Sequence, residues 1–537
     1  MKPIALAMAL SAALPAAPLS PEPLRGITGA EQLARVYDTI FDADVDRLPE
    51  ALAHACPPAP HEVCRVLDAV ALWWQIQLDP LDLSLDEALA RRVSYAVASA
   101  ETWTTREPHR AEAWFYLGGA YGVRVQWRVL RGERLAAARD GKRVKGALEK
   151  ALALDPDLHD AWFGIGLYHY YADVAPAAAR VLRWLLFLPG GDRVRGLQEM
   201  LRARQNGALL RSEADYQLHI IYLWYEEEPA RALELLDALR HRHAQNPHFL
   251  QRIAEVQDVY QHDLTASLRS WQALFEAARR HTVLHAEMAE ARARLGMARQ
   301  LDRLFETDVA IDHLRAVVAS DPAAPFGAVA QAQLHLGQAL DRMGDHDEAV
   351  AAYRAALAAT GDYDPLDIEA RARSAMRHRV DTDETTAYRK SLEGWRALER
   401  GDIPAAAEAI EHSLALRPRD AVTRYRQAKL LQAQHDEDAA LKVLEAVVGA
   451  RKATPPTIYA TACVDAARLF ERRGDRGRAI DLYRIARGVF GADARTKRAA
   501  ERALTRLAAS MQARSPRALK CFTRASEKNI ERARRRF

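Results

Sequence analysis

The sequence predicts an all-α chain built from repeated helical hairpins. Alanine, leucine, arginine and glutamate are prominent among its 537 residues, and all four favour helix. Its 24 prolines and 26 glycines are spread between helical patterns rather than gathered in a linker. Self-similar segments recur, such as "AAAEAIEHSLALRPRDA" at 405–421 and "KGALEKALALDPDLHDA" at 145–161. Recurrence of this kind predicts a solenoid, because a single hairpin cannot bury its own apolar face.

The N-terminal residues have the pattern of a secretory signal peptide. Lys2 precedes a mostly apolar stretch from Ile4 to Leu14, and small residues and prolines follow. The apolar stretch is too short to cross a bilayer as a helix. We therefore expect residues 1–20 to be a signal peptide and the protein to be exported, either periplasmic or secreted. An alanine-rich segment without that role is the alternative.

Residues 21–110 are expected to form an N-terminal helical cap that precedes the repeats. "LDEALARRVSYAVASAETW" has the apolar periodicity of an amphipathic helix. Cys56 and Cys64 flank the proline-rich loop "PPAPHEV" and would be able to close a disulfide in an oxidising compartment. Two separate buried thiols are the alternative, because sequence spacing does not set the geometry that a disulfide needs.

The repeating unit combines large and small residues at regular intervals. In "AEAWFYLGGAYG" these include Trp114, Gly118 and Tyr121, and a later unit repeats the pattern with Gly337 and Tyr353. The pattern resembles the tetratricopeptide repeat, in a protein of the bacterial exported type. That family has a helix–turn–helix unit of about 34 residues, with small residues at positions 8 and 20 and a proline at position 32. The resemblance covers about nine units over residues 111–490 and implies a right-handed superhelical solenoid.

The first part of the array, residues 111–322, is expected to hold long, irregular, aromatic-rich repeats. Positions 8 and 20 of its second unit, Gly166 and Gly196, are 30 residues apart where the family has 12. The inserted stretch is rich in aromatic side chains. These side chains either fill the seams between helices or form a pocket for a small apolar or glycan ligand. The residues that would line such a pocket are Tyr168, Tyr170, Tyr171 and Trp184.

Regular repeats are expected over residues 323–492, with one additional helix at "PLDIEARARSAMRHRV" (365–380). Residues 493–537 should supply a C-terminal capping helix and a basic tail. The part from Arg514 on has a net charge of +7 in a chain whose net charge is +4, so the rest is net negative and the main body lacks the basic footprint of a nucleic-acid-binding protein. The tail would contact an anionic surface weakly, or its arginines would favour the dipole of their own helix.

Motifs for catalysis or cofactor binding are absent from the sequence. No nucleophile elbow, phosphate loop or paired Cys/His arrangement occurs. His281 and His285 have helical spacing for two metal ligands, but the pattern places no third ligand with them. We therefore expect a protein that is not an enzyme and has no metal or cofactor.

The family resemblance implies that a ligand lies in the concave groove, against the first helices of the repeats. The expected function is a non-enzymatic scaffold that binds a protein or peptide there, with the aromatic pocket as the alternative. The family's carboxylate clamp of Lys and Asn is not reproduced, which disfavours a chaperone tail as the partner. The residues carried onto the groove are Gln331, Gln338, Tyr388, Trp395, Tyr425, Lys429 and Arg468.

Overall fold

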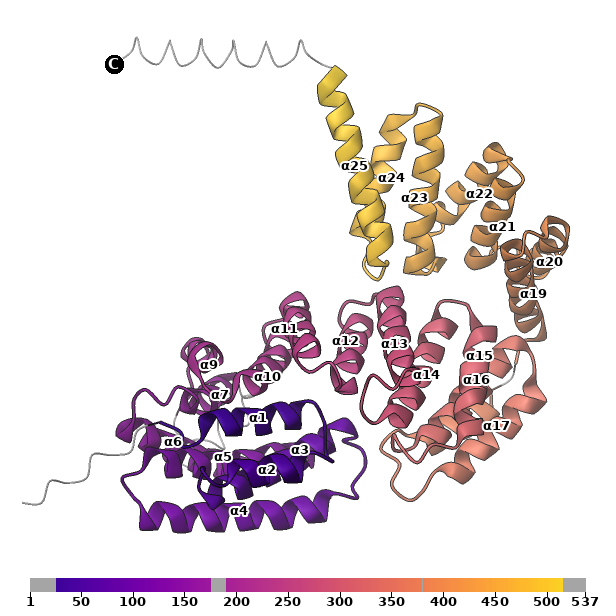
Figure 1. The fold of residues 1–537 in the computed structure, drawn as a ribbon. Helices are drawn as coiled ribbons and strands as arrows, with labels where there is room; N and C mark the ends of the chain where they lie inside the picture. Colours follow the sequence, from indigo (N-terminus) through magenta and orange to yellow (C-terminus); the bar gives the residue numbers. More distant parts are fainter. Residues whose placement is uncertain (1–25, 175–189, 379, 515–537) are drawn as a thin grey trace, which may run out of the picture. The chain divides into compact units, whose positions relative to one another are not determined.

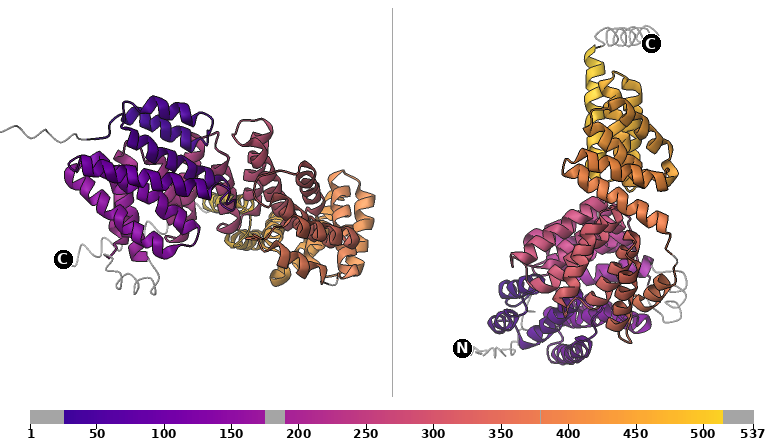
Figure 2. Two further views of the ribbon diagram at one scale, coloured as in Figure 1. Left: turned by 90° about the horizontal axis from the view of Figure 1, so that it is seen from below. Right: turned by 90° about the vertical axis from the view of Figure 1, so that its right-hand side faces the viewer.

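The computed structural model describes residues 26–174, 190–378 and 380–514. Within these ranges every regular element is a helix and no strand occurs (Figure 1). Two further views show the same all-helical architecture (Figure 2). The all-α class predicted from the sequence is therefore confirmed. None of the described helices is long and apolar enough to cross a membrane.

The chain divides into two compact units. The first comprises Met1–Tyr37, Leu48–Trp73 and Glu87–Ala214, and the second comprises Asp38–Arg47, Trp74–Asp86 and Asp215–Phe537. Four of the described helices, α1, α3, α4 and α10, contribute residues to both units. The first ten helices begin and end as follows: α1 Ala30–Phe41, α2 Leu48–Ala55, α3 His61–Leu78, α4 Asp86–Arg106, α5 Ala111–Leu130, α6 Arg134–Leu154, α7 Ala161–Val174, α9 Arg193–Asn206, α10 Arg211–Trp224 and α11 Pro229–Arg242.

The second unit consists mainly of consecutive antiparallel hairpins. Each hairpin pairs a first helix with a second helix of similar length, as the repeat pattern predicts. One further helix, α18 (Ile368–Met376), stands between two hairpins, where the sequence predicts an additional helix. The hairpins are α12 Pro247–Val259 with α13 Leu264–Arg279, α14 Ala286–Arg303 with α15 Thr307–Ser320, α16 Ala328–Met343 with α17 His346–Ala359, α19 Thr382–Glu399 with α20 Ile403–Leu416, α21 Ala421–Ala433 with α22 Glu437–Gly449, and α23 Pro456–Arg472 with α24 Arg476–Gly488, followed by α25 Ala494–Arg514.

Large side chains at repeat position 24 fill the space left by small residues in the helices around them. A Cβ atom added at Gly337 would come within 2.5 Å of the Tyr353 ring in the same hairpin. Leu148 fills two such spaces, because added Cβ atoms at Gly118 and at Gly164 would lie 2.6 and 2.4 Å from its methyl groups. Gly118 belongs to the same hairpin as Leu148, and Gly164 belongs to the next one. One large residue therefore sets the spacing within a repeat and between repeats.

Gly166 of α7 and Gly196 of α9 bring two backbones into direct contact. A Cβ atom on Gly166 would lie 2.7 Å from the carbonyl oxygen of Gly196, and one on Gly196 would lie 2.6 Å from the carbonyl oxygen of Gly166. These two glycines are positions 8 and 20 of the second predicted unit. The insertion between them therefore leaves their pairing unchanged, and α9 is the second helix of that repeat.

The helix ends lie where their sequence signals predict them. Asp192, which follows the Pro-Gly-Gly turn, caps α9 by accepting a hydrogen bond from the Arg195 amide at 2.9 Å. The proline at repeat position 32 follows the end of the second helix, because proline cannot continue a helix. This holds for Pro156 after α6, Pro322 after α15 and Pro418 after α20.

The structure joins Cys56 and Cys64 by a disulfide between the end of α2 and the first turn of α3. Cys463, in α23, is a buried free thiol, and burial raises its pKa to about 11. Its environment is apolar and it has no cysteine partner among the described residues. The expected signal peptide at residues 1–20, the basic residues after Arg514 and Cys521 lie outside the described residues.

Candidate binding groove

Two layers of helices form the repeats of the second unit. The first helices contact each other in series, from α12 through α14, α16, α19, α21 and α23 to α25. Consecutive second helices do not approach each other to this extent within the described residues. In a stack of hairpins the layer with the closer spacing lies on the inside of the curve. The first helices therefore form the concave wall, as the repeat resemblance implies.

Repeat position 9 remains accessible on five consecutive first helices. In α23, for example, ten residues are buried while Arg468 is exposed. The side chain of Lys429 in α21 is 32% exposed and that of Arg468 is 55% exposed. We call these five residues the position-9 row: Arg299 of α14, Gln338 of α16, Trp395 of α19, Lys429 of α21 and Arg468 of α23.

A buried carboxylate connects three of the predicted groove residues. Asp465 of α23 is 5% exposed and accepts a hydrogen bond from the Tyr425 hydroxyl at 3.1 Å. Its carboxylate also pairs with Lys429 at 3.2 Å and with Arg468 at 3.2 Å. Burial and the neighbouring Asp465 charge raise the pKa of Tyr425, so its hydroxyl stays protonated as a donor. Tyr425, Lys429 and Arg468 are thus brought together, and Asp465 holds them.

A second buried charge lies beside the aromatic groove residues of α19. Arg426 is 4% exposed, and its guanidinium donates to the Ser391 hydroxyl at 2.9 Å and to the Phe305 carbonyl at 2.8 Å. The same guanidinium lies 5.8 Å from the Trp395 ring centre. Burial lowers the pKa of Arg426. Arg426 thus connects α21 to α19 and to the α14–α15 turn. Its guanidinium also makes a cation–π contact with the Trp395 ring.

Tyr388 is a structural residue rather than a free groove residue. Its hydroxyl lies 2.6 Å from the Thr307 hydroxyl, and its ring lies 6.0 Å from the Arg342 guanidinium. Burial raises the pKa of Tyr388. The hydroxyl therefore joins α19 to the start of α15. Of the residues carried over from the family, Tyr388 and Tyr425 use their hydroxyls inside the chain, whereas Trp395 and Gln338 remain partly accessible.

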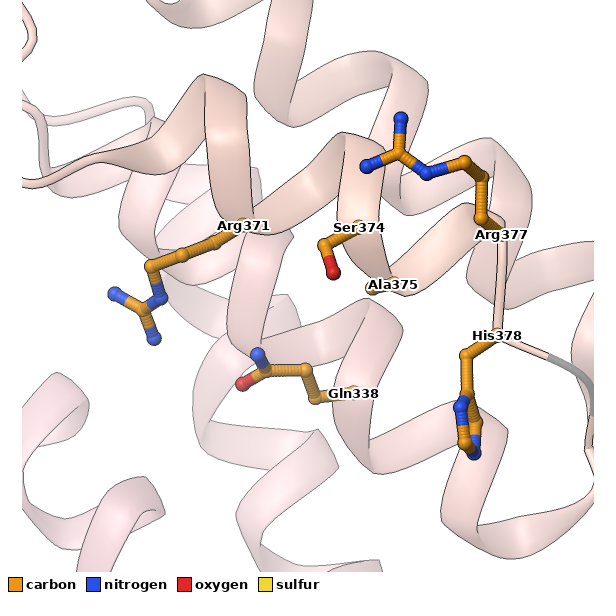
Figure 3. A pocket seen from close by; sticks show the side chains of 6 residues that line it. All are labelled: Gln338, Arg371, Ser374, Ala375, Arg377 and His378. Atoms are coloured by element: carbon orange, nitrogen blue, oxygen red, sulfur yellow. The ribbon is translucent and has the colours of Figure 1, made fainter.

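The two predicted glutamines lie on α16. Gln331 donates weakly to the Phe326 carbonyl, at 3.5 Å. Gln338 lines an open, shallow hollow of about 500 Å³ between α16 and α18 (Figure 3). The remaining residues of that hollow come from α18 and the two positions after it: Arg371, Ser374, Ala375, Arg377 and His378.

The aromatic residues considered for a pocket in the first unit lie on α7. Tyr170 is completely buried, and its backbone packs against Gly196 of α9. Tyr168 is partly buried and lies beneath the Lys145 ammonium, 5.8 Å from its ring centre. Tyr171 packs edge-on against Tyr170 with 5.7 Å between ring centres. Tyr170 is therefore a seam residue. Trp184 lies outside the described residues.

His281 and His285 do not share a helix face. Both lie in the connection between α13 and α14, with left-handed backbone angles at φ 52°, so the helical spacing considered for a metal pair is wrong. His285 instead contacts the Ala43 carbonyl at 3.1 Å. Among the described residues no three His, Cys, Asp or Glu side chains are placed to hold a metal ion.

Sequence reasoning missed several residues of this region. Asp465 and Arg426 occupy repeat position 6, which faces the preceding repeat and for which no groove role was expected. Arg299 was detectable, because counting back from Ala310 at position 20 places it at position 9 of the α14–α15 repeat. The arginines of α18 could not be assigned to a repeat position, because that helix belongs to no repeat.

The fold defines a helical-repeat protein. Residues 330–363, which span most of α16 and all of α17, match the model of the tetratricopeptide repeat family, so the chain contains a tetratricopeptide repeat. No curated protein sequence matches the chain significantly.

Several solved structures share the helical-hairpin architecture. A tetratricopeptide repeat protein from Parabacteroides merdae has 16% identity and a TM-score of 0.24, with 54% of this chain and 98% of that chain covered. A Rap protein complexed with competence and sporulation factor has 12% identity, a TM-score of 0.32, and coverage of 89% and 98%. Yeast Tom70 has 12% identity, a TM-score of 0.25, and coverage of 81% and 99%. At these TM-scores none of them matches the arrangement of the whole chain.

Proposed function

We propose that the protein is a non-catalytic scaffold that binds a protein or peptide segment along the first helices of its second unit. The position-9 row carries this proposal. Five consecutive first helices each leave an amide, aromatic or cationic side chain accessible at repeat position 9. Such a row suits an extended segment, which offers side chains and backbone groups at regular intervals.

The supports beneath the row favour a preformed site. Asp465 fixes Lys429 and Arg468, and Arg426 lies under Trp395, so these side chains are held before a partner arrives. Preorganised side chains lose less conformational entropy on binding. Trp395 is the expected energetic centre, because tryptophan and arginine dominate the binding energy of protein interfaces.

Site-specific photocrosslinking in the protein's own cells tests the proposal. The photoreactive residue p-benzoylphenylalanine is placed at position 395 in the row, or at Arg354 on α17 as a matched control. Arg354 is exposed on a second helix, away from the concave wall. We expect protein adducts from position 395 that position 354 does not give.

Identical adducts from both positions would refute groove binding. Adducts from none of positions 395, 354 and 331 would refute the scaffold function itself, since the probe at position 331 leaves Trp395 in place. Trp395→Ala in a chain that carries the photoreactive residue at position 331 provides a second measurement. It should reduce the adduct yield about tenfold or more if Trp395 is a hot spot of the interface.

We also propose that the protein acts outside the cytoplasm. The N-terminal pattern and the Cys56–Cys64 disulfide both support export, because disulfides persist mainly in oxidising compartments. N-terminal sequencing of the mature chain tests this proposal. We expect the chain to begin after Ala13 or Ala16, and an intact N-terminus on the mature protein would refute export.

A further inference from the structure

The hollow between α16 and α18 is lined by hydrogen-bond donors. Arg371 and Ser374 come from α18, Gln338 comes from α16, and Arg377 and His378 follow the end of α18 (Figure 3). The Gln338 amide oxygen is already engaged by Nδ1 of His335 at 3.1 Å, so its NH₂ group is left to donate. No carboxylate lines the hollow.

The arginines of this hollow lack a salt-bridge partner within the described residues. Arg371 and Arg377 form no ion pair there, whereas Arg373 of the same helix pairs with Glu369 at 2.7 Å. Asp364 is near enough to Arg371 for their charges to interact, but the two form no salt bridge. Arg299 of α14 is exposed and also forms no ion pair with a described residue. Burial, together with the charges of Arg371 and Arg299, lowers the pKa of His335 to about 4.

Donors without acceptors, combined with unpaired guanidinium groups, match an anion that only accepts hydrogen bonds. Carboxylates fulfil this condition, and arginine binds them with two parallel hydrogen bonds. The hollow is open to solvent, where a single ion pair contributes little free energy. A carboxylate on a segment that is already bound in the groove would contribute more, because tethering raises its effective concentration at the hollow.

The hollow is continuous with the proposed groove. Gln338 belongs both to the hollow and to the position-9 row, and Arg299, on the neighbouring first helix, extends the positive charge along that row. α18 itself belongs to no repeat. Its arginines are therefore an addition to the groove rather than a family position.

We propose that the hollow formed by Gln338, Arg371, Ser374 and Arg377 binds the carboxylates of an acidic segment of the protein partner. This assignment rests on the proposed function and names the chemistry of the partner. The segment would present Asp or Glu side chains, or a terminal carboxylate, to α18 while its remainder lies along the first helices.

Arginine protection in the full-length protein tests the assignment without any substitution. Phenylglyoxal modifies accessible arginines, and peptide mapping by mass spectrometry reads Arg371, Arg377 and Arg373 separately. We expect a hexaglutamate peptide to slow modification of Arg371 and Arg377 several-fold and to leave Arg373 unchanged. A hexaglutamine peptide should protect none of them.

Three results would overturn the assignment. The first is no protection of Arg371 and Arg377 by hexaglutamate. The second is equal protection of Arg373, which would show a diffuse charge effect. The third is equal protection by inorganic phosphate at the same concentration, which would identify a general phosphate site rather than a carboxylate site for an acidic segment.

A variant pair separates this assignment from the proposed function. Arg371→Gln with Arg377→Gln should reduce the adduct yield from position 395 about tenfold, as expected for the loss of two charge-assisted contacts. Arg373→Gln should leave the yield unchanged. An undiminished yield in the double variant would refute the α18 site and leave groove binding intact. A wild-type chain without adducts would refute groove binding, and the phenylglyoxal measurement would still decide whether the hollow binds carboxylates.

Discussion

Asp465 of α23 accepts a hydrogen bond from the hydroxyl of Tyr425 of α21 across the boundary between two repeats, at 3.1 Å. The same carboxylate pairs with Lys429 and Arg468, so one buried acid organises three side chains that the repeat pattern assigns to the groove. Asp465 therefore supports both the packing between these two repeats and the positions of Lys429 and Arg468 in the position-9 row. A substitution of Asp465 should change both.

Asp465→Asn should destabilise the second unit by about 1–3 kcal/mol, because it leaves partly buried Lys429 without its carboxylate. Asp438→Asn is a matched control, since Asp438 pairs with Arg473 on an exposed surface and such pairs contribute under about 1 kcal/mol. Urea unfolding followed by circular dichroism measures both variants. Equal losses in the two variants would show that Asp465 has no special role.

Gly166→Ala should destabilise the first unit by about 1–3 kcal/mol or more, because the added methyl group meets backbone atoms that cannot rotate away. Gly146→Ala in α6 provides the contrast. A Cβ at Gly146 meets nothing within 4 Å, so alanine should be neutral or stabilise by about 0.5–1 kcal/mol. Thermal unfolding compares the two, and a stable Gly166→Ala variant would contradict the backbone contact with Gly196.

Acid should destabilise the second unit through two buried histidines. Burial lowers the pKa of His219 to about 3, with Arg252 adding to the effect, and burial also lowers the pKa of His248. Their neutral forms persist in the folded chain, whereas unfolded histidine takes up a proton near pH 6.5. Below that pH the unfolded chain binds more protons, so stability falls as the pH drops from about 6.5, and the His219 contribution continues to about pH 3.

Each of these histidines should steepen the fall by about 1.4 kcal/mol per pH unit. Urea unfolding at pH 7, 6 and 5 gives the slope, and His219→Gln should make it shallower by about that amount. The slope is the diagnostic quantity, because the substitution also changes stability at neutral pH. An unchanged slope in the variant would mean that His219 is protonated in the folded chain.

Reduction of the Cys56–Cys64 disulfide should destabilise the first unit by about 2–3 kcal/mol, as chain entropy predicts for a short closed loop. The doubly substituted chain, Cys56→Ser with Cys64→Ser, should show the same loss and no further response to reductant. Thermal unfolding with and without dithiothreitol checks both statements. If dithiothreitol leaves the thermal unfolding of the wild-type chain unchanged, the disulfide has no structural role.

The sequence predicted the structure best where small residues recur at the repeat positions at which helices pack closely. The pairing of Gly166 with Gly196 followed from the period alone, because only small residues allow two helices to approach that closely. The additional helix was also predicted correctly, since helical periodicity is a local signal.

The polar seam was not predictable in the same way. Asp465 and Arg426 act between helices that are distant in sequence, and their partners depend on how closely α19, α21 and α23 approach each other. The loss of Tyr388 from the free groove has the same origin, because its partner Thr307 lies 81 residues away. Periodicity shows which face a residue occupies, but not which polar group it meets there.

The position of α18 has a consequence for how this protein can change. α16 contacts α19 directly, so the array continues past α18 as it would without it. Ile368 and Ala372, both buried, attach α18 to the core, and the opposite side of that helix is unconstrained by the repeat period. If α18 binds the partner as we propose, substitutions on that side should change what the protein binds without changing how its repeats stack. Selection or design would then be able to change the binding specificity while the repeat architecture stays the same.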